Sequence, residues 1–205
     1  MVKCEPIIYI VDDDEAIRDS LSLLLESEGL KARAYAGARK FLDGFEAPSL
    51  ACILLDMRMP GMNGMELLRE LSARRIETPV IMMTAYGDVP MAVHAMQEGA
   101  VDFIEKPADS QILLKRIRRC LNQQKASGDR TGEYIAEAEC LARLSDRERE
   151  VMELLVQGNM NKQIAAKLDI SPRTVEVHRA RIKQKLDVKT LPDVVRIALS
   201  HEHFF

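Results

Sequence analysis

Acidic residues follow two apolar segments of this chain at a spacing that suits the binding of a cation. Asp12, Asp13 and Asp14 come directly after one apolar run, and Asp56 comes directly after another. Carboxylates that lie about 4 Å apart repel one another by roughly 1 to 4 kcal/mol per pair, so a cluster of them calls for a positive charge. Oxygen ligands suit Mg²⁺, which keeps some of its waters and bridges to phosphoryl oxygens. If the fold brings these residues together, they are candidates for a magnesium site.

A hydroxyl group and an ammonium group follow two further apolar segments. Thr84 ends one of them, and Lys106 comes just after the other. If a carboxylate here attacks phosphorus, the cation and Lys106 can neutralise the developing charge while Thr84 donates a hydrogen bond to a phosphoryl oxygen. The structural alternative is that the acids cap turns and helices and that Lys106 is a solvated loop residue. That alternative suits each residue singly, but not all of them at successive strand ends.

The elements that would position these side chains alternate between short apolar runs and amphipathic stretches. Strands are predicted over residues 7–11, 31–35, 51–55, 80–84 and 101–104. The first, third and fourth are nearly all apolar, whereas 31–35 alternates like an edge strand. Helices are predicted over residues 14–28, 64–73, 89–98 and 109–123. The pattern predicts a doubly wound, flavodoxin-like α/β domain with a five-stranded parallel sheet. Its polar side chains should converge where the carboxyl ends of the strands meet.

Four motifs strengthen this interpretation: VDDD at 11–14, LLDMRMPGMNGMELL at 54–68, MTAYGD at 83–88 and FIEKP at 103–107. In their order and spacing they resemble the receiver domain of two-component response regulators. The resemblance implies that Asp56 accepts a phosphoryl group from a sensor histidine kinase, and that the peptide bond between Lys106 and Pro107 is cis. The Mg²⁺ ligands that it implies are Asp12, Asp13, Asp56 and the backbone carbonyl of Arg58. It implies phosphoryl contacts for Thr84 and Lys106, which leaves Asp14 to cap a helix.

The switch of such receivers couples Thr84 to an aromatic residue on the fifth strand, where this chain has Phe103. This resembles the FixJ-type branch. Phosphorylation adds close to two negative charges, which would pull Thr84 inward and open space for Phe103. Because Phe cannot donate a hydrogen bond, packing alone would drive its rotation. The face formed by residues 89–98 and the fifth strand should then change shape, and it could form a dimer surface.

The last third of the chain has a different pattern. Residues 1–122 form the predicted receiver, residues 123–140 a polar linker, and residues 141–205 a small all-α domain. Ser145 and Glu148 form a capping box, S-x-x-E, and NKQIAAKL, DISP and RTVEVHRARIKQKL read as helix, turn and helix. Residues 141–205 carry 12 basic and 9 acidic residues, a net charge of +3. A solvated helix face or a polyanion partner would both explain this charge.

The second helix of this pair has two distinct faces. Val175, Ile182 and Leu186 repeat at spacings of seven and four, which predicts a buried stripe. The side chains predicted to point outward, toward a DNA major groove, are Arg173, Glu176, Val177, Ala180, Arg181 and Gln184. Residues 144–186 resemble the LuxR-type helix-turn-helix. The resemblance implies base contacts from Glu176, Val177 and Ala180, and phosphate contacts from Lys162, Thr174, Arg181 and Lys185. Glu176 could instead pair with Arg173 and Arg179 at helical spacing.

Together these features predict a phosphorylation-controlled transcription regulator. One recognition helix seldom binds DNA tightly, so we expect a phosphorylated homodimer on double-stranded DNA, with RNA polymerase as a further partner. The four cysteines form no C-x-x-C pair, and the apolar run near the N-terminus is too short for a signal peptide or membrane span. We therefore expect a cytoplasmic protein that does not contact the membrane.

Two alternatives differ in the chemistry of the acidic site. A phosphohydrolase that forms an aspartyl-phosphate would need a second acid two residues after Asp56, but Met57 and Arg58 follow it. We therefore expect that the chain is not an enzyme. A receiver that is never phosphorylated could also bind DNA constitutively, and only phosphotransfer measurements would distinguish it.

Overall fold

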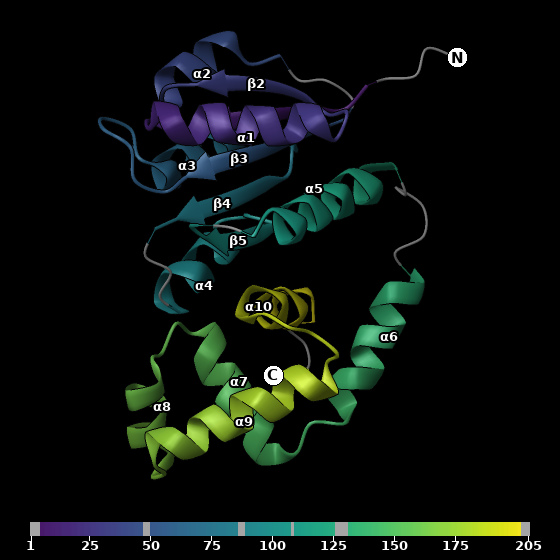
Figure 1. The fold of residues 1–205 in the computed structure, drawn as a ribbon. Coiled ribbons are helices and arrows are strands. Elements are labelled where there is room, and N and C mark those ends of the chain that lie inside the picture. The colour runs from purple at the N-terminus through teal and green to yellow at the C-terminus, as the bar shows by residue number, and fades with distance from the viewer. Residues whose placement is uncertain (1–4, 47–49, 86–88, 108, 126–130, 202–205) are drawn as a thin grey trace. The chain divides into compact units, whose positions relative to one another are not determined.

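The computed structural model describes residues 5–46, 50–85, 89–107, 109–125 and 131–201. Contacts divide the chain into two units (Figure 1), one of residues 1–87 and 98–127, the other of residues 88–97 and 128–205. Among the described residues, no helix is long and apolar enough to cross a membrane.

A five-stranded sheet with the order β2-β1-β3-β4-β5 forms the centre of the first unit. Its strands are β1 (Ile7–Val11), β2 (Lys31–Tyr35), β3 (Ala51–Asp56), β4 (Val80–Thr84) and β5 (Asp102–Glu105). Every pairing is parallel. The predicted doubly wound α/β fold is therefore confirmed, and the alternating segment is the edge strand β2.

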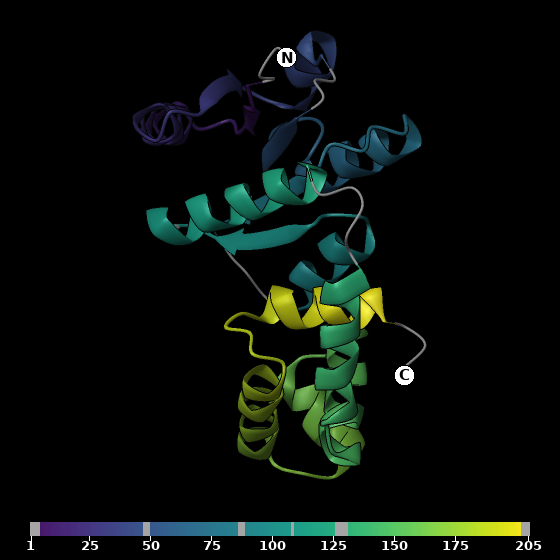
Figure 2. The ribbon, with the colours of Figure 1, turned by 90° about the vertical axis from the view of Figure 1, so that its right-hand side faces the viewer.

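In the described part of this unit, the helices are α1 (Glu15–Ser27), α2 (Ala38–Gly44), α3 (Gly64–Ala73) and α5 (Ser110–Lys125). Helices α1 and α5 lie on one face of the sheet, and α2 and α3 lie on the other (Figure 2). Leu25 of α1 and Ile117 of α5 share a core with Ile10 and Leu54 of the sheet. Because both faces of the sheet are covered, the central strands are almost entirely apolar.

Helix α2 was not predicted from the sequence. It has only seven residues, too few for a periodic apolar pattern to emerge. An aromatic cluster holds it on the sheet. The ring of Phe41 lies 5.7 Å from that of Tyr9 and 5.4 Å from that of Tyr35, both in edge-on geometry.

The second unit is helical, as predicted for the C-terminal domain. Its helices are α4 (Val89–Gln97), α6 (Thr131–Ala142), α7 (Asp146–Val156), α8 (Asn161–Leu168), α9 (Pro172–Lys185) and α10 (Leu191–Ser200). Helix α6 begins inside the predicted linker, residues 126–130 of which lie outside the described residues. The domain boundaries themselves stay a prediction.

Local signals in the sequence explain where the helices of the C-terminal half begin. Ser145 and Glu148 form the expected capping box at the start of α7. Helix α8 ends at Leu168, and its C-cap Asp169 has a left-handed backbone with φ of 53°. Ser171 then caps α9 by accepting a hydrogen bond from the Thr174 backbone N–H. The core of this half includes Val175 and other residues of α7 to α10. The predicted helix, tight turn and helix are therefore present as α8 and α9.

Candidate functional site

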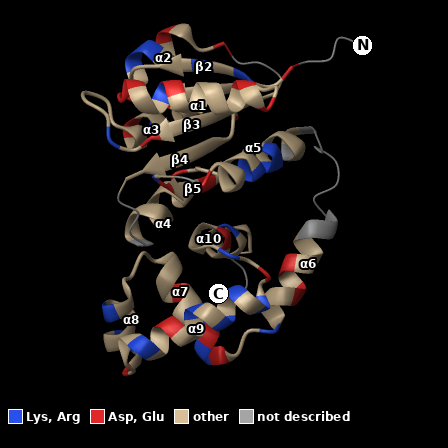
Figure 3. Cartoon of the chain, in the orientation of Figure 1, with Lys and Arg blue, Asp and Glu red and all other residues tan. Residues whose placement is uncertain are grey.

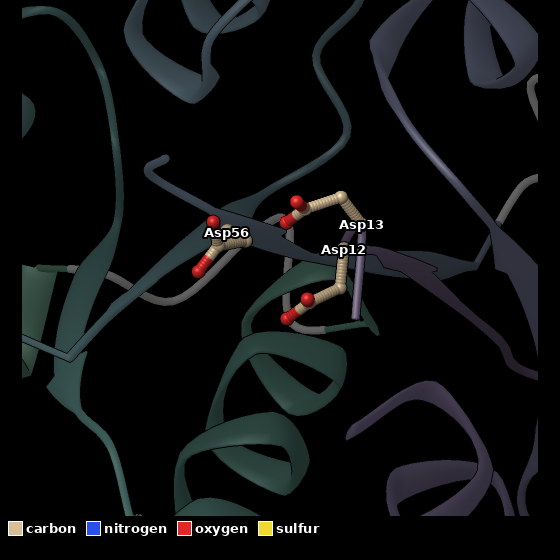
Figure 4. Close-up of side chains that lie close together, drawn as sticks. All are labelled: Asp12, Asp13 and Asp56. Carbon is tan, nitrogen blue, oxygen red and sulfur yellow. The ribbon is translucent and has the colours of Figure 1, made fainter. Parts of the chain in front are cut away.

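The three predicted metal-binding carboxylates lie together at one edge of the sheet. Val11 pairs with Leu55 in the register of β1 and β3, so the residues that follow these two positions, Asp12 and Asp56, come out side by side. Each of Asp12, Asp13 and Asp56 offers an oxygen within 4.8 Å of the others, and their carboxylates face a shared space (Figure 4). Asp12 and Asp56 are buried, whereas Asp13 is exposed.

Lys106 places its positive charge between the two buried acids. Its Nζ donates hydrogen bonds to Asp12 Oδ2 at 2.6 Å and to Asp56 Oδ1 at 2.5 Å. Its backbone N–H donates to the Thr84 carbonyl at 2.6 Å, which fixes the end of β5 beside the end of β4. The peptide bond between Lys106 and Pro107 is cis, as the resemblance implied.

Burial and ion pairing oppose each other in this cluster. Burial raises the pKa of Asp56 above its ordinary value, and the hydrogen bond from Lys106 only partly offsets the effect. Burial alone would lower the pKa of Lys106, but the contacts with Asp12 and Asp56 outweigh it and raise that pKa. Lys106 is therefore held in its charged form. Lys106 therefore offsets part of the negative charge of the acids from within the protein.

Backbone geometry fixes the second oxygen of Asp56. Asp56 Oδ2 accepts a hydrogen bond from the Arg58 backbone N–H at 2.7 Å. The role of the Arg58 carbonyl as a metal ligand stays a prediction. Asp14 takes the capping role expected of it, since its Oδ1 accepts from the Ala16 backbone N–H at 2.9 Å.

Gly64 is a residue of this site that our sequence analysis did not identify. A Cβ at this position would lie 2.2 Å from the Asp56 carbonyl oxygen and 2.9 Å from Met57 Cα, both backbone atoms. The Gly64 N–H donates to the Met57 carbonyl at 3.0 Å. The start of α3 therefore packs directly on the end of β3, and only glycine permits this approach. The second glycine of the PGMNG motif is the feature of the sequence that could have indicated this close approach.

The two residues predicted to form the switch lie on neighbouring strands of the sheet. Thr84 ends β4 with 1% of its surface exposed, and Phe103 lies on β5 opposite Met82 with 6% exposed. The ring of Phe103 is thus already buried in this structure. An open depression of about 480 Å³ adjoins the acids and includes Asp13, Arg58 and Met57 in its lining.

The recognition face predicted on α9 is exposed. Val175, Ile182 and Leu186 are buried as expected. The exposed side chains of this face are Arg173, Glu176, Val177, Ala180, Arg181 and Gln184, and Lys162 of α8 is exposed too. Figure 3 shows the basic residues distributed along α9. Among the described residues, Glu176 has no ion-pair partner, so the predicted pairing with Arg173 or Arg179 is not present.

Two of the predicted DNA contacts are engaged within the domain. Lys185 Nζ donates to Glu148 Oε2 at 2.6 Å and to the Arg143 carbonyl at 2.9 Å. Glu148 is buried, and its pKa is lowered because hydrogen bonds from Lys185 and Ser145 outweigh the opposing effect of burial. Lys185 therefore joins α9 to α7 in this structure. The Thr174 hydroxyl lies 2.8 Å from the Ser171 hydroxyl at the start of α9.

Comparisons with known proteins cover both halves of the chain. The family model of the response regulator receiver domain matches residues 8–118, and that of bacterial regulatory proteins of the luxR family matches residues 142–198. The transcriptional regulatory protein FixJ of Azorhizobium caulinodans is 46% identical over 192 residues, which cover 94% of this chain and 91% of that protein.

Solved structures give similar coverage. The response regulator StyR is 38% identical with a TM-score of 0.57, over 96% of this chain and 99% of that one. Full-length FixJ from B. japonicum is 42% identical with a TM-score of 0.55, over 96% and 97% of the two chains. The matched segments contain the acidic cluster and the exposed face of α9.

Proposed function

This chain belongs to the response regulators that join a receiver domain to a LuxR-type DNA-binding domain, and from that premise we propose that phosphorylation of Asp56 controls its binding to DNA. The proposal is carried by one observation: the carboxylates of Asp12, Asp13 and Asp56 converge, and Lys106 contacts two of them. A sensor histidine kinase is the proposed phosphodonor. The chain is a transcription regulator, and we place it in the cytoplasm.

The residues of the cluster fit a bound Mg²⁺ ion. Asp12, Asp13 and Asp56 supply carboxylate oxygens, which are hard ligands, and the backbone carbonyl of Arg58 would complete the protein's share. Such an ion would neutralise charge on the phosphoryl group during transfer. The cluster needs this added charge, because Lys106 alone balances only one of three carboxylates.

The position of Asp56 supports the following phosphoryl transfer. A carboxylate oxygen of Asp56 attacks phosphorus, the bond from phosphorus to the kinase histidine nitrogen breaks, and an aspartyl-phosphate forms. Lys106 then exchanges a carboxylate contact for a phosphoryl oxygen, and Thr84 donates its hydroxyl to another. Phe103 would respond to the movement of Thr84 by repacking, which would change the surface of β5 and favour a receiver dimer.

Dimerisation would then raise the affinity for DNA. A single helix-turn-helix buries only about 600 to 1,000 Å², whereas two copies add their contacts. Helix α9 would enter the major groove, with Glu176, Val177 and Ala180 at base edges and with Arg173, Arg181, Thr174 and Lys162 toward the backbone. Two such helices would reach half-sites about 34 Å apart. RNA polymerase is the proposed further partner at the promoter.

A phosphotransfer experiment tests the chemical step. Purified protein is incubated with Mg²⁺ and a small acyl phosphate, and intact mass and gel filtration are recorded. We expect the mass of one added phosphoryl group and a shift to the dimer, both lost in Asp56→Asn. A phosphoryl group that remains on the Asp56→Asn protein, or none on the wild type under any donor, would reject the proposal.

A further inference from the structure

A hydrogen bond joins the two helices of the helix-turn-helix. Arg179, in the middle of α9, donates from Nη1 to Asn161 Oδ1 at 2.5 Å. Asn161 is the first residue of α8. Arg179 is only partly exposed, unlike Arg173 and Arg181 on the same helix. The guanidinium is therefore fixed at the junction of α8 and α9 and does not extend freely into solvent.

This hydrogen bond to a neutral amide does not neutralise the charge of Arg179. An amide oxygen accepts one of the five N–H donors of a guanidinium and carries no charge. Within the described parts of the chain, no ion pair of Arg179 with a carboxylate is present. Burial lowers the pKa of Arg179, an effect that the nearby charge of Glu176 opposes. A partly buried cation without a counter-charge is costly, so an incoming anion would stabilise it.

Glu176 is the acid that could otherwise neutralise Arg179. It lies three residues before Arg179 on the same helix, a spacing at which side chains meet. Yet Glu176 is exposed and, in the described structure, has no ion pair. Because Asn161 holds the guanidinium toward α8, two opposite charges at contact spacing stay apart. Pairing would remove both from the surface that faces DNA.

We propose that Asn161 is a positioning residue, which keeps Arg179 away from Glu176 so that Arg179 contacts a DNA backbone phosphate and Glu176 faces a base edge. This inference rests on the proposed DNA-binding function. The phosphate supplies the counter-charge that Arg179 lacks, and the Glu176 carboxylate can accept from the cytosine amino group only while it is unpaired. In this proposal Asn161 itself contacts neither the DNA phosphate nor the base.

Three variants separate this role from that of a structural tether. Binding of the phosphorylated full chain is measured, as a function of salt, to a duplex that the wild type selects from a random pool. In Asn161→Ala, Arg179 turns to Glu176, and the slope of log K against log salt should fall by about 0.9, the contribution of one phosphate contact. Asn161→Asp keeps the hydrogen bond but neutralises Arg179, so the slope should fall without a lower melting temperature. Adding Glu176→Gln to Asn161→Ala should restore the slope.

The matched control is another asparagine close by in the same domain. Asn159 donates from Nδ2 to the Leu154 carbonyl at 2.8 Å and does not contact Arg179. Asn159→Ala should lower the melting temperature and leave the salt slope unchanged. Discrimination against a duplex with the selected cytosine positions replaced should weaken in Asn161→Ala but not in Asn159→Ala.

The outcomes also separate this inference from the function on which it rests. Wild-type slopes in both Asn161→Ala and Asn161→Asp, or no recovery with Glu176→Gln, would overturn the positioning role while DNA binding stands. If the phosphorylated wild type selects no duplex at all, the proposed function itself fails.

Discussion

The charged side chains at the acidic edge of the receiver are paired with one another, whereas charged side chains on the exposed face of α9 are not. At the edge of the sheet, Lys106 lies against Asp12 and Asp56, and all three are largely shielded from water. On α9, the exposed Glu176 and Arg181 have no ion-pair partner among the residues that the structure describes. A ligand that binds at the acidic edge must therefore replace one of the ion pairs between Lys106 and the two acids. The exposed face of α9 offers its charges directly to an external polyanion.

Lys185 shows that position on a helix does not decide which behaviour a residue adopts. It lies on the same helix as Arg181, yet it is joined to the buried Glu148. The difference is the neighbouring helix: α7 presents an acid where α9 ends. Charges near a binding face can therefore belong to the core rather than to the interface.

The largest expected effect comes from Gly64→Ala, which tests whether the acidic edge is as tightly built as its charges require. The added Cβ meets backbone atoms of Asp56 and Met57, so β3 and α3 must separate. We expect a loss of about 3 kcal/mol in the free energy of unfolding, measured with urea. In Gly44→Ala the Cβ meets the Tyr35 ring, which can move, and the loss should be smaller. Equal losses would show that the close approach is unimportant.

Lys106→Met would break the internal neutralisation itself. It leaves Asp12 and Asp56 buried without their cation, and removing one partner of a buried pair is strongly destabilising. We expect a loss of about 2 kcal/mol in the absence of metal, recovered in large part when Mg²⁺ is added. Thermal melts with and without Mg²⁺ measure both. If Mg²⁺ does not reduce the loss of stability, the acids do not bind the metal as proposed.

A pH titration tests the buried carboxylate of Glu148 in the DNA-binding half. The pKa of Glu148 is lowered from its ordinary value of 4.5. Its stabilising contribution is therefore fully present above about pH 4.5 and is lost as the pH falls through the lower, folded value. In Glu148→Gln this part of the pH dependence should vanish, a change of about 1 kcal/mol. A titration curve of unchanged shape between wild type and variant would contradict the assignment.

The smallest expected effect contrasts two cations of α9. Arg181→Gln removes an exposed charge and should lower the salt slope of DNA binding by about 0.9. Lys185→Gln removes a charge that Glu148 already neutralises, so the slope should stay close to wild type although stability falls. Equal slopes in the two variants would remove the distinction between core and interface charges.

Much of this molecule was predictable from its sequence, because periodicity and strand ends are local signals. The central strands are continuous apolar runs, and the acids directly follow two of them, so their convergence required only the parallel topology. Helix α2 is too short to show a period, and its position depends on aromatic contacts with distant strands.

The partners of Lys185 and Arg179 could not be predicted for a related reason. Each side chain is engaged by a residue on another helix, Glu148 or Asn161, and helical spacing says nothing about such contacts. Gly64 lay within a recognised motif, but its role depends on how closely α3 approaches β3. The sequence pattern thus predicts which residues lie close together, but tertiary packing determines which of their side chains remain free to bind a ligand.

The central claim, that the phosphoryl group on Asp56 controls DNA binding, is tested most directly by DNA affinity. Wild type and Asp56→Asn are titrated against the same duplex at one salt concentration, with and without an acyl phosphate and Mg²⁺. We predict that the donor raises the affinity of the wild type by roughly tenfold or more, about 1.4 kcal/mol, and leaves that of Asp56→Asn unchanged. An equal rise in Asp56→Asn, or a wild-type affinity that does not respond to the donor, would contradict the account.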